Sequence, residues 1–212
     1  MRGKIWVRIA GVLLFLAIVM LGSVLILSPD PLGFLRRAEV TAADVPDWVD
    51  VQLIPVDGAS RRGDKLEAVN DIVIHYVGNP GTGAQNNRNW FANPDSEVSA
   101  HFVVGLEGEV ILCVPLDEKS SASNWRNRDT ISVEVCHPDE TGVFTDASYD
   151  SLVRLTVWLC DTYGLTARHV IRHYDVTGKK CPLYFVEHED AWEGFRADVE
   201  AKRGTAEEEK QD

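Results

Sequence analysis

Histidine and cysteine side chains occur together in one short stretch near the carboxyl end of the chain. His173 and Cys181 lie eight positions apart in RHYDVTGKKCP, on either side of the turn-forming pair Thr177-Gly178. Such a turn can fold the chain back so that an imidazole and a thiolate point at one spot. Zinc prefers these ligands, and a catalytic zinc site needs three protein ligands and one open position for water. The stretch therefore indicates two of the three ligands of a metal site.

A candidate third ligand is His75, near the end of the apolar run Asp71–Val77, which predicts a buried strand. A metal would engage one ring nitrogen of such a histidine, and a backbone carbonyl can hold the other. The alternatives are a hydrogen-bonded core histidine at position 75 and a structural or disulfide-bonded thiol at position 181. Because His75 lies 98 residues before His173, spacing alone leaves these alternatives open.

The elements that must position these residues alternate between strand and helix patterns. Short apolar runs predict strands over 71–77, 100–104, 109–114, 131–136 and 169–173, and apolar residues at helical spacing predict helices over 84–91, 148–163 and 191–199. Gly164 is expected to end the second helix. The pattern predicts an α/β domain with a central sheet and helices packed on it.

Composition limits the class of protein. The 212 residues are 45% hydrophobic and 25% charged, with four cysteines, which excludes a disordered, collagen-like or disulfide-dense chain. The length suits one domain of about 150 to 170 residues plus an appendage. The net charge of -12 argues against nucleic acid as the main partner, because phosphate binding needs a basic surface.

The amino-terminal region predicts a membrane anchor. Residues 9–27 form a run of 19 residues without a charged side chain, long enough for a helix to span about 28 Å of hydrocarbon. Residues 1–40 carry a net charge of +3 and the remainder carries -15, so the positive-inside rule keeps the amino terminus cytoplasmic and exports the domain. A cleaved signal peptide and a buried core helix are the alternatives.

These observations predict a single-pass protein of the cell membrane with its domain on the extracytoplasmic side. The expected divisions are a basic cytoplasmic end (1–8), a transmembrane signal-anchor helix (9–27), a tether (28–50), the folded domain (51–202) and a disordered acidic tail (203–212).

Four segments, taken in order, resemble one known family. IVIHYVGNPGTGAQNNRNWF, VSAHFVVGLEGEV, ISVEVCHPDETGVF and IRHYDVTGKKCPLYF are similar to the zinc-dependent N-acetylmuramoyl-L-alanine amidases of the type-2 amidase family, which includes phage amidases and peptidoglycan-recognition proteins. The resemblance extends from about Val51 to Val199. It implies a central mixed β-sheet flanked by helices, one zinc ion per chain held by His75, His173 and Cys181, and peptidoglycan as the partner of a monomeric catalytic domain.

The resemblance also implies roles for two charged residues. Glu134 in ISVEVC corresponds to the family's catalytic glutamate, a general base toward the zinc-activated water, and Lys179 corresponds to a lysine that stabilises the oxyanion. The alternation of ISVEVC also allows a solvent-facing Glu134. A solvated turn lysine is the alternative for Lys179, and it is the expected state of Lys180.

Three further residues are candidates for substrate binding. His101 follows Ala100, where some relatives have a tyrosine, and is expected to line the cleft. Asn86 lies on the helix that flanks the family's cleft, and an exposed Trp125 would suit a sugar ring. Ordinary surface positions are the alternative for Asn86 and Trp125.

The other cysteines, Cys113, Cys136 and Cys160, lie in apolar surroundings and are expected to be buried free thiols. A Cys113–Cys136 disulfide is the alternative in an exported protein.

The resemblance implies hydrolysis of the amide that joins muramic acid to L-alanine, and two other functions are alternatives to it. A non-catalytic peptidoglycan-binding module usually lacks the cysteine ligand, which is present here as Cys181. A zinc peptidase of the commonest helical type would carry an H-E-x-x-H pattern, which this sequence lacks.

Overall fold

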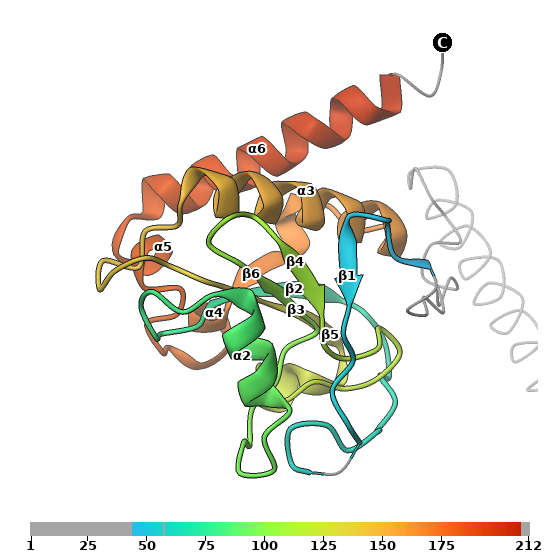
Figure 1. The fold of residues 1–212 in the computed structure, drawn as a ribbon. Coiled ribbons are helices and arrows are strands. Elements are labelled where there is room, and N and C mark those ends of the chain that lie inside the picture. Colours follow the sequence, from blue (N-terminus) through green and yellow to red (C-terminus); the bar gives the residue numbers. More distant parts are fainter. Residues whose placement is uncertain (1–43, 57, 209–212) are drawn as a thin grey trace, which may run out of the picture. The chain divides into compact units, whose positions relative to one another are not determined.

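The computed structural model describes residues 44–56 and 58–208, with side chains described as far as Arg203. A six-stranded sheet forms its centre, with the strand order β1-β4-β3-β5-β2-β6. The strands are β1 (Val49–Val51), β2 (Asp71–Tyr76), β3 (Phe102–Val104), β4 (Val110–Leu112), β5 (Thr130–Val135) and β6 (Val170–Arg172), as Figure 1 shows.

The sheet is mixed, as expected. Only β3 and β4 pair in antiparallel fashion among the described strands, and every other neighbouring pair is parallel. A tight connection joins β3 to β4 and contains Gly108 at φ 83°, a conformation that favours glycine. Parallel pairing gives β5, β2 and β6 a common direction, so their carboxyl ends lie at one edge of the sheet.

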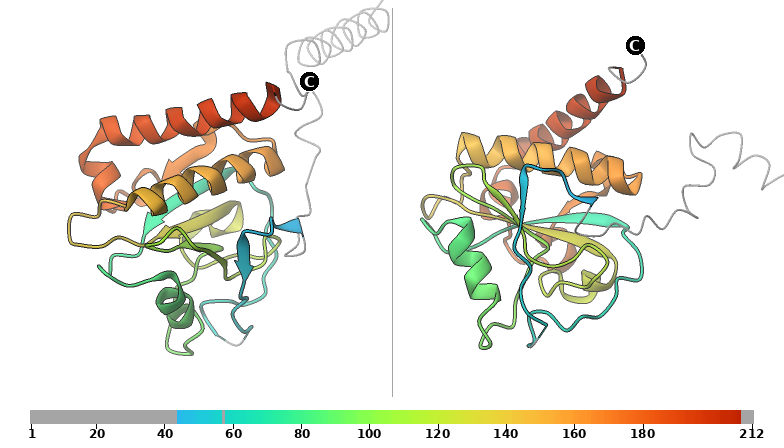
Figure 2. Two further views of the ribbon diagram at one scale, coloured as in Figure 1. Left: turned by 45° about the horizontal axis from the view of Figure 1, so that its top comes forward. Right: turned by 45° about the vertical axis from the view of Figure 1, so that its right-hand side comes forward.

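Helices cover both faces of the sheet (Figure 2). The long helices α3 (Asp146–Tyr163) and α6 (Glu189–Glu208) lie side by side over one face, and α2 (Ala84–Phe91) lies against the other. Short elements complete the fold: η3 (Asn124–Arg128), η4 (Ala167–His169), α4 (His173–Thr177) and α5 (Leu183–Glu187).

Strand alternation divides the core between the two faces. On β3, Phe102 packs with the larger apolar cluster, which includes Leu152 of α3 and Phe195 of α6. The neighbouring Val103 points the other way and packs with the smaller cluster, which includes Phe91 of α2. Both clusters are closed to solvent, and each buried side chain of this size contributes roughly 1.5–3 kcal/mol. The sheet is therefore held rigidly between its two helical layers.

The boundaries of α3 follow from its capping residues. The Thr145 side chain accepts a hydrogen bond from the Ser148 backbone at 3.0 Å, which fixes the first turn. Gly164 adopts the left-handed conformation at φ 66° and ends the helix. The predicted stop at Gly164 is confirmed, and the helix begins two residues before the predicted start.

Several predicted boundaries differ from the observed ones. The strand predicted over 169–173 is limited to Val170–Arg172, because His169 ends η4 and His173 begins α4. Strand β1 starts at residue 49, inside the predicted tether, because it pairs with β4. Helix α6 continues to Glu208, through much of the predicted tail of 203–212.

All four cysteines are free and buried, which confirms the expectation for Cys113, Cys136 and Cys160, and no Cys113–Cys136 disulfide forms. The predicted membrane segment, residues 9–27, lies outside the described residues, as does the basic end before it. No helix within the described part of the chain is long and apolar enough to cross a membrane.

Candidate active site

The site lies at the carboxyl edge shared by β5, β2 and β6, the place where open α/β sheets commonly bind ligands. His75, near the end of β2, is in register with Glu134 on β5, so both side chains project from the same face of the sheet. On the other side of β2, His173 directly follows β6 as the first residue of α4. Three neighbouring strands thus deliver two imidazoles and a carboxyl group to one point.

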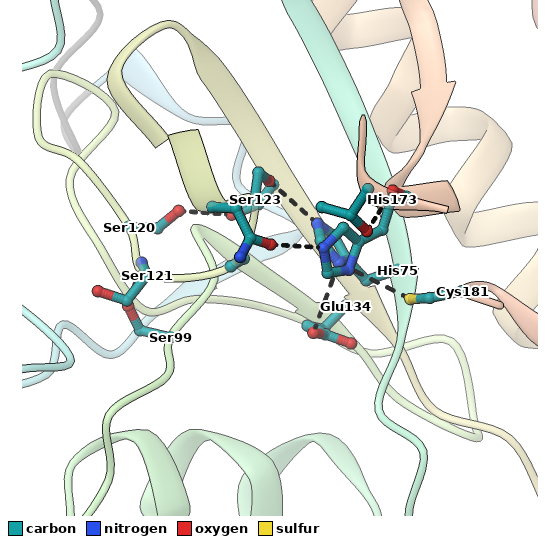
Figure 3. A network of polar contacts seen from close by, with 12 residues as sticks. His75, Ser99, Ser120, Ser121, Ser123, Glu134, His173 and Cys181 are labelled. Carbon is teal, nitrogen blue, oxygen red and sulfur yellow. Dashed lines mark hydrogen bonds and ion pairs between the residues drawn. The ribbon is translucent and has the colours of Figure 1, made fainter. Parts of the chain in front are cut away.

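Cys181 reaches the same point from a loop. Helix α4 ends at Gly178, where φ is 78°, and the chain then turns back toward the sheet. The donor atoms of His75, His173 and Cys181 all lie within 4.8 Å of one another, and Nδ1 of His75 is 3.8 Å from Sγ of Cys181. Figure 3 shows the three side chains facing one another, with Glu134 beside them.

The donor set fits a zinc ion. Two imidazoles and one thiolate are ligands that zinc prefers, and three protein ligands leave a coordination position open. His173 Nδ1 is buried and has no hydrogen-bond partner among the described residues, which is the state expected of an atom that serves as a ligand. The residues present therefore suit the metal that the family resemblance implied.

The electrostatics of the cluster favour neutral imidazoles. Burial lowers the pKa of His75 well below its ordinary value, and the charges of His173 and Lys179 lower it further. Burial, followed by the charge of Lys179, also lowers the pKa of His173. Both rings are therefore uncharged near neutral pH, and each has a lone pair free for a metal.

Cys181 is protonated in the absence of a cation. Burial raises the pKa of its thiol to about 12, the charge of Glu134 acts in the same direction, and a hydrogen bond from the Tyr76 backbone opposes both. Because a metal binds the thiolate, coordination here would release a proton.

Glu134 is the carboxyl group of the cluster. Its Oε1 lies 4.0 Å from Nδ1 of His75, and its side chain is 18% exposed. Oε2 is buried without a hydrogen-bond partner among the described residues. Burial raises the pKa of Glu134 to about 8, and the charge of Lys179 partly offsets this. A carboxyl group with a pKa near the working pH can both take up and release a proton.

Lys179 and Lys180 occupy different surroundings. Lys179 lines the same cavity as the cluster, and its charge lowers the pKa values of both histidines. Lys180 instead forms an exposed ion pair with Glu187 at 2.8 Å, and its side chain is 66% exposed. The expected surface position of Lys180 is confirmed.

An open cavity of about 1200 Å³ joins these residues to solvent. The cluster and Lys179 line one side. The lining also includes Arg62, Glu97 and the exposed Val98, together with Asn124 and Asn127. Pockets for drug-sized ligands measure about 300–1,000 Å³, so a cavity of this size has room for a ligand of several sugar or amino-acid units.

A buried ion pair fixes the chain next to Arg62, one of the residues that line the cavity. Arg61 donates two hydrogen bonds to the carboxylate of Glu118, at 2.8 and 3.1 Å, and a third to the backbone oxygen of Ile54. The side chains of Arg61 and Glu118 are only 10% and 12% exposed. Ser99 donates a hydrogen bond to the backbone oxygen of Ser60 and completes the attachment.

His173 is held in place by the residue before it. The guanidinium group of Arg172 donates to both oxygens of Asp175, to the Phe185 backbone oxygen and, at 2.6 Å, to Glu189. It also lies 5.2 Å from the ring centre of Trp192. Arg172 therefore connects the start of α4 to α5 and α6.

The structure brings together His75, Glu134, His173, Lys179 and Cys181, which are all five residues proposed for the metal and the chemistry. It does not place the three substrate-binding candidates, Asn86, His101 and Trp125, among the lining residues of the cavity.

Each of these three has other contacts or surroundings. His101 is fully buried, with Nε2 2.9 Å from the Glu118 backbone oxygen and Nδ1 3.1 Å from Ser132 Oγ. Asn86 accepts a hydrogen bond from the Gly83 backbone at the start of α2. Trp125 is 62% exposed and has the guanidinium group of Arg126 5.3 Å from its ring centre.

Two polar residues beside the cluster were not foreseen. Ser123 Oγ lies 3.2 Å from Nε2 of His75, and Asn124 Oδ1 lies 2.9 Å from Nε2 of His173. Serine and asparagine are common in loops, so the presence of these residue types does not predict a position in the site. The one available sign is that asparagine tolerates the left-handed conformation that Asn124 adopts at φ 55°.

The fold and the donor set define a mixed α/β protein with a candidate His-His-Cys metal site. Residues 65–183, more than half of the chain, match the family described as N-acetylmuramoyl-L-alanine amidase. The chain belongs to this amidase family.

Individual relatives agree with this assignment. N-acetylmuramoyl-L-alanine amidase BlyA of Bacillus subtilis (strain 168) is 33% identical in an alignment of length 170 that covers 70% of this chain and 46% of BlyA. N-acetylmuramoyl-L-alanine amidase CwlL of Bacillus licheniformis is 31% identical in an alignment of length 168 that covers 71% of this chain and 46% of CwlL. The chain thus spans about half the length of the curated relatives it matches.

Solved structures share the fold. The catalytic domain of XlyA superposes with a TM-score of 0.63 at 24% identity, over 71% of this chain and 98% of that domain. The PlyG catalytic domain gives a TM-score of 0.64 at 24% identity, over 73% of this chain and 94% of that domain. At this level of identity the likeness concerns the fold.

Proposed function

We propose that this protein hydrolyses the amide bond between N-acetylmuramic acid and L-alanine in cell-wall peptidoglycan. Membership of the amidase family supports this activity. The observation that carries it is the position of Glu134: a poorly solvated carboxyl group lies 4.0 Å from an imidazole of the candidate metal site, in the same open cavity. A merely structural metal site would need neither the carboxyl group nor the cavity.

The proposed cofactor is one zinc ion per chain, held by His75, His173 and Cys181. When bound, zinc would polarise the scissile carbonyl and lower the pKa of the attacking water. The two buried neutral imidazoles and the thiol described above support this assignment.

Glu134 is the proposed general base. In its ionised form it takes a proton from the attacking water, and in its protonated form it gives that proton to the leaving amine of L-alanine. In the metal-free protein burial raises the pKa of Glu134 to about 8, which favours the protonated form that the second step needs. The charge of a bound zinc ion would favour the ionised form that the first step needs. Loss of such a group lowers the rate roughly 10²- to 10⁴-fold.

Lys179 is proposed to stabilise the oxyanion that develops on the carbonyl. It is a cation on the cavity wall, and no ion pair of its ammonium group occurs among the described residues. Removal of one oxyanion-stabilising group lowers the catalytic rate about 10²- to 10³-fold. Lys180 is the matched control, because it carries the same charge one position later and pairs with Glu187 outside the cavity.

Digestion of purified peptidoglycan tests the proposal. The full-length chain, loaded with zinc, should release new amino termini of L-alanine and leave the glycan intact, as mass spectrometry of the products would show. Glu134→Gln and Lys179→Met should lower the rate by the factors given above, while Glu140→Gln and Lys180→Met should not. New reducing ends would identify a glycosidase instead. Binding to the wall without any cleavage would support the alternative of a non-catalytic peptidoglycan-binding module.

We further propose that residues 9–27 anchor the protein in the cell membrane, with the amino terminus cytoplasmic and the catalytic domain on the cell-wall side. Support comes from the length of the uncharged run and from the basic residues before it. An anchored protein should remain in membranes after a carbonate wash, with its intact mass. A soluble product that has lost about its first 28 residues would show a cleaved signal peptide instead.

A further inference from the structure

A single turn of the chain contacts both imidazoles of the candidate metal site. Ser123 Oγ is 3.2 Å from Nε2 of His75, and the next residue, Asn124, places Oδ1 2.9 Å from Nε2 of His173. Figure 3 shows Ser123 on the side of His75 away from Cys181. Nε2 of each of the two rings is thus held by one of two adjacent residues.

The contact with Asn124 determines which nitrogen of His173 carries the proton. The Oδ1 atom of an amide only accepts, so Nε2 must donate, and Nδ1 keeps its lone pair. Nδ1 is buried with no partner among the described residues. The opposite assignment would bury an Nδ1–H group without an acceptor, which costs about 1–3 kcal/mol. The tautomer that the turn selects is the one that presents Nδ1 to a metal.

The turn is held in a conformation that serves these contacts. Within the described residues, Asn124 is the only non-glycine residue with a positive φ, at 55°. Asn127 Oδ1 accepts hydrogen bonds from the backbone of Ala122 at 3.1 Å and of Ser123 at 2.6 Å. Arg126, two residues after Asn124, is fixed by Asp71 and Asp129. The backbone before and after Asn124 is therefore fixed on both sides.

We infer that Ser123 and Asn124 are positioning residues for the metal: they hold His75 and His173 through Nε2 so that Nδ1 of each ring is left for the ion, and Asn124 also selects the tautomer of His173. This inference rests on the zinc site proposed above. Hydrogen-bond partners of ligand histidines fix ring orientation and raise ligand basicity, and their loss lowers metal affinity about 10- to 100-fold. Asn124 should have the larger effect, because its contact is shorter and its amide oxygen is only an acceptor.

Two substitutions of Asn124 separate the side chain from the backbone. Asn124→Gly removes the acceptor and keeps the left-handed conformation, which glycine adopts without strain. Asn124→Asp keeps an acceptor oxygen and tolerates the same conformation. Ser123→Ala tests the contact with His75 alone. All variants would be prepared as the full-length chain in detergent and compared in the metal-free state by thermal unfolding.

Zinc affinity, measured by competition with a chelating dye, is the first readout. Asn124→Gly should bind zinc about 10- to 100-fold more weakly than the wild type, without a lower melting temperature in the metal-free state. Asn124→Asp should bind at least as tightly as the wild type. Equal affinity of Asn124→Gly and the wild type, or an equal loss in Asn124→Asp, would overturn the inference.

Histidine ¹⁵N NMR of the metal-free protein is the second readout. We expect His173 to be in the Nε2–H tautomer in the wild type and in Asn124→Asp, and to populate the Nδ1–H tautomer in Asn124→Gly. A wild-type His173 in the Nδ1–H form would refute the inference whatever the affinity. Failure of the wild type to bind zinc would refute the proposed cofactor, and the tautomer measurement would still decide the role of Asn124.

Discussion

Replacing Glu134 by glutamine in the metal-free protein tests whether this carboxyl group is as poorly solvated as its surroundings indicate. Glutamine has nearly the same shape as a protonated glutamate and cannot ionise. The substitution therefore removes one titration and leaves the packing of β5 in place. All measurements would include a chelator, so that every form of the protein lacks metal.

The expected effect of Glu134 on the free energy of unfolding follows from the shift in its pKa. Glu134 titrates at about 8 in the folded protein, against an ordinary value of 4.5 in the unfolded chain. Between these values the folded protein holds a proton that the unfolded chain has released, so the free energy of unfolding falls as the pH rises through this window. The raised pKa of Glu134 lowers the free energy of unfolding by less than about 1 kcal/mol at about pH 5, by about 3 kcal/mol at about pH 7 and by about 4 kcal/mol at about pH 8.

Urea unfolding at a series of pH values measures this penalty. Glu134→Gln should match the wild type within about 1 kcal/mol near pH 5 and be more stable by about 3–4 kcal/mol near pH 8. The histidines and Cys181 titrate in both proteins, so taking the difference between the proteins removes their direct contributions. Glu140→Gln is the control, because Glu140 is an exposed carboxylate a few residues further along the chain.

A constant difference between the two proteins from about pH 5 to about pH 8 would refute the reasoning. It would mean that Glu134 has an ordinary pKa and is well solvated in the folded protein. In that case the proposed general base would lack the raised pKa that suits it to give its proton to the leaving amine.

Three further outcomes are expected. Arg61→Met should lower the free energy of unfolding by about 3–5 kcal/mol in urea, because Glu118 is left charged and unpaired; a loss below about 1 kcal/mol would contradict a buried pair. Gly108→Ala should lower the melting temperature far more than Gly164→Ala. Both glycines have a positive φ, but a Cβ at position 108 would lie 2.8 Å from atoms of α3, whereas a Cβ at position 164 would meet nothing within 4 Å. Similar decreases in melting temperature for the two variants would contradict this packing. Burial raises the pKa of Cys113 to about 12, so iodoacetamide should label it only after unfolding; rapid labelling of the folded protein would show an accessible thiolate.

The elements of the fold were predictable because their signals are local. Alternation and apolar runs located five of the six strands, and Gly164 marked the end of α3. Strand β1 was missed, because three residues with the burial pattern of an edge strand carry little periodicity. Neither the sheet order nor the register could be predicted from such patterns, since both depend on contacts between distant segments.

The site required more than local signals. His75 and His173 lie 98 residues apart and meet only because β2 and β6 are parallel neighbours, a pairing that spacing does not reveal. Resemblance to the family supplied the ligand set. The alternation of ISVEVC left the direction of Glu134 open, and the register with His75 places it in the cluster. The contact between Asn124 and His173 could not be predicted, because it depends on the left-handed conformation of one loop residue.

Arg172 gives the last helix a part in the site. The matched family region ends at residue 183, after the last of the candidate catalytic and ligand residues, while Glu189 and Trp192 lie beyond it. A fragment cut at that boundary would keep all five of these residues and lose two groups that hold the guanidinium group beside His173. The structural support of the candidate site therefore extends beyond the matched family region, and a fusion or truncation near the start of α6 would alter the surroundings of the candidate ligand His173.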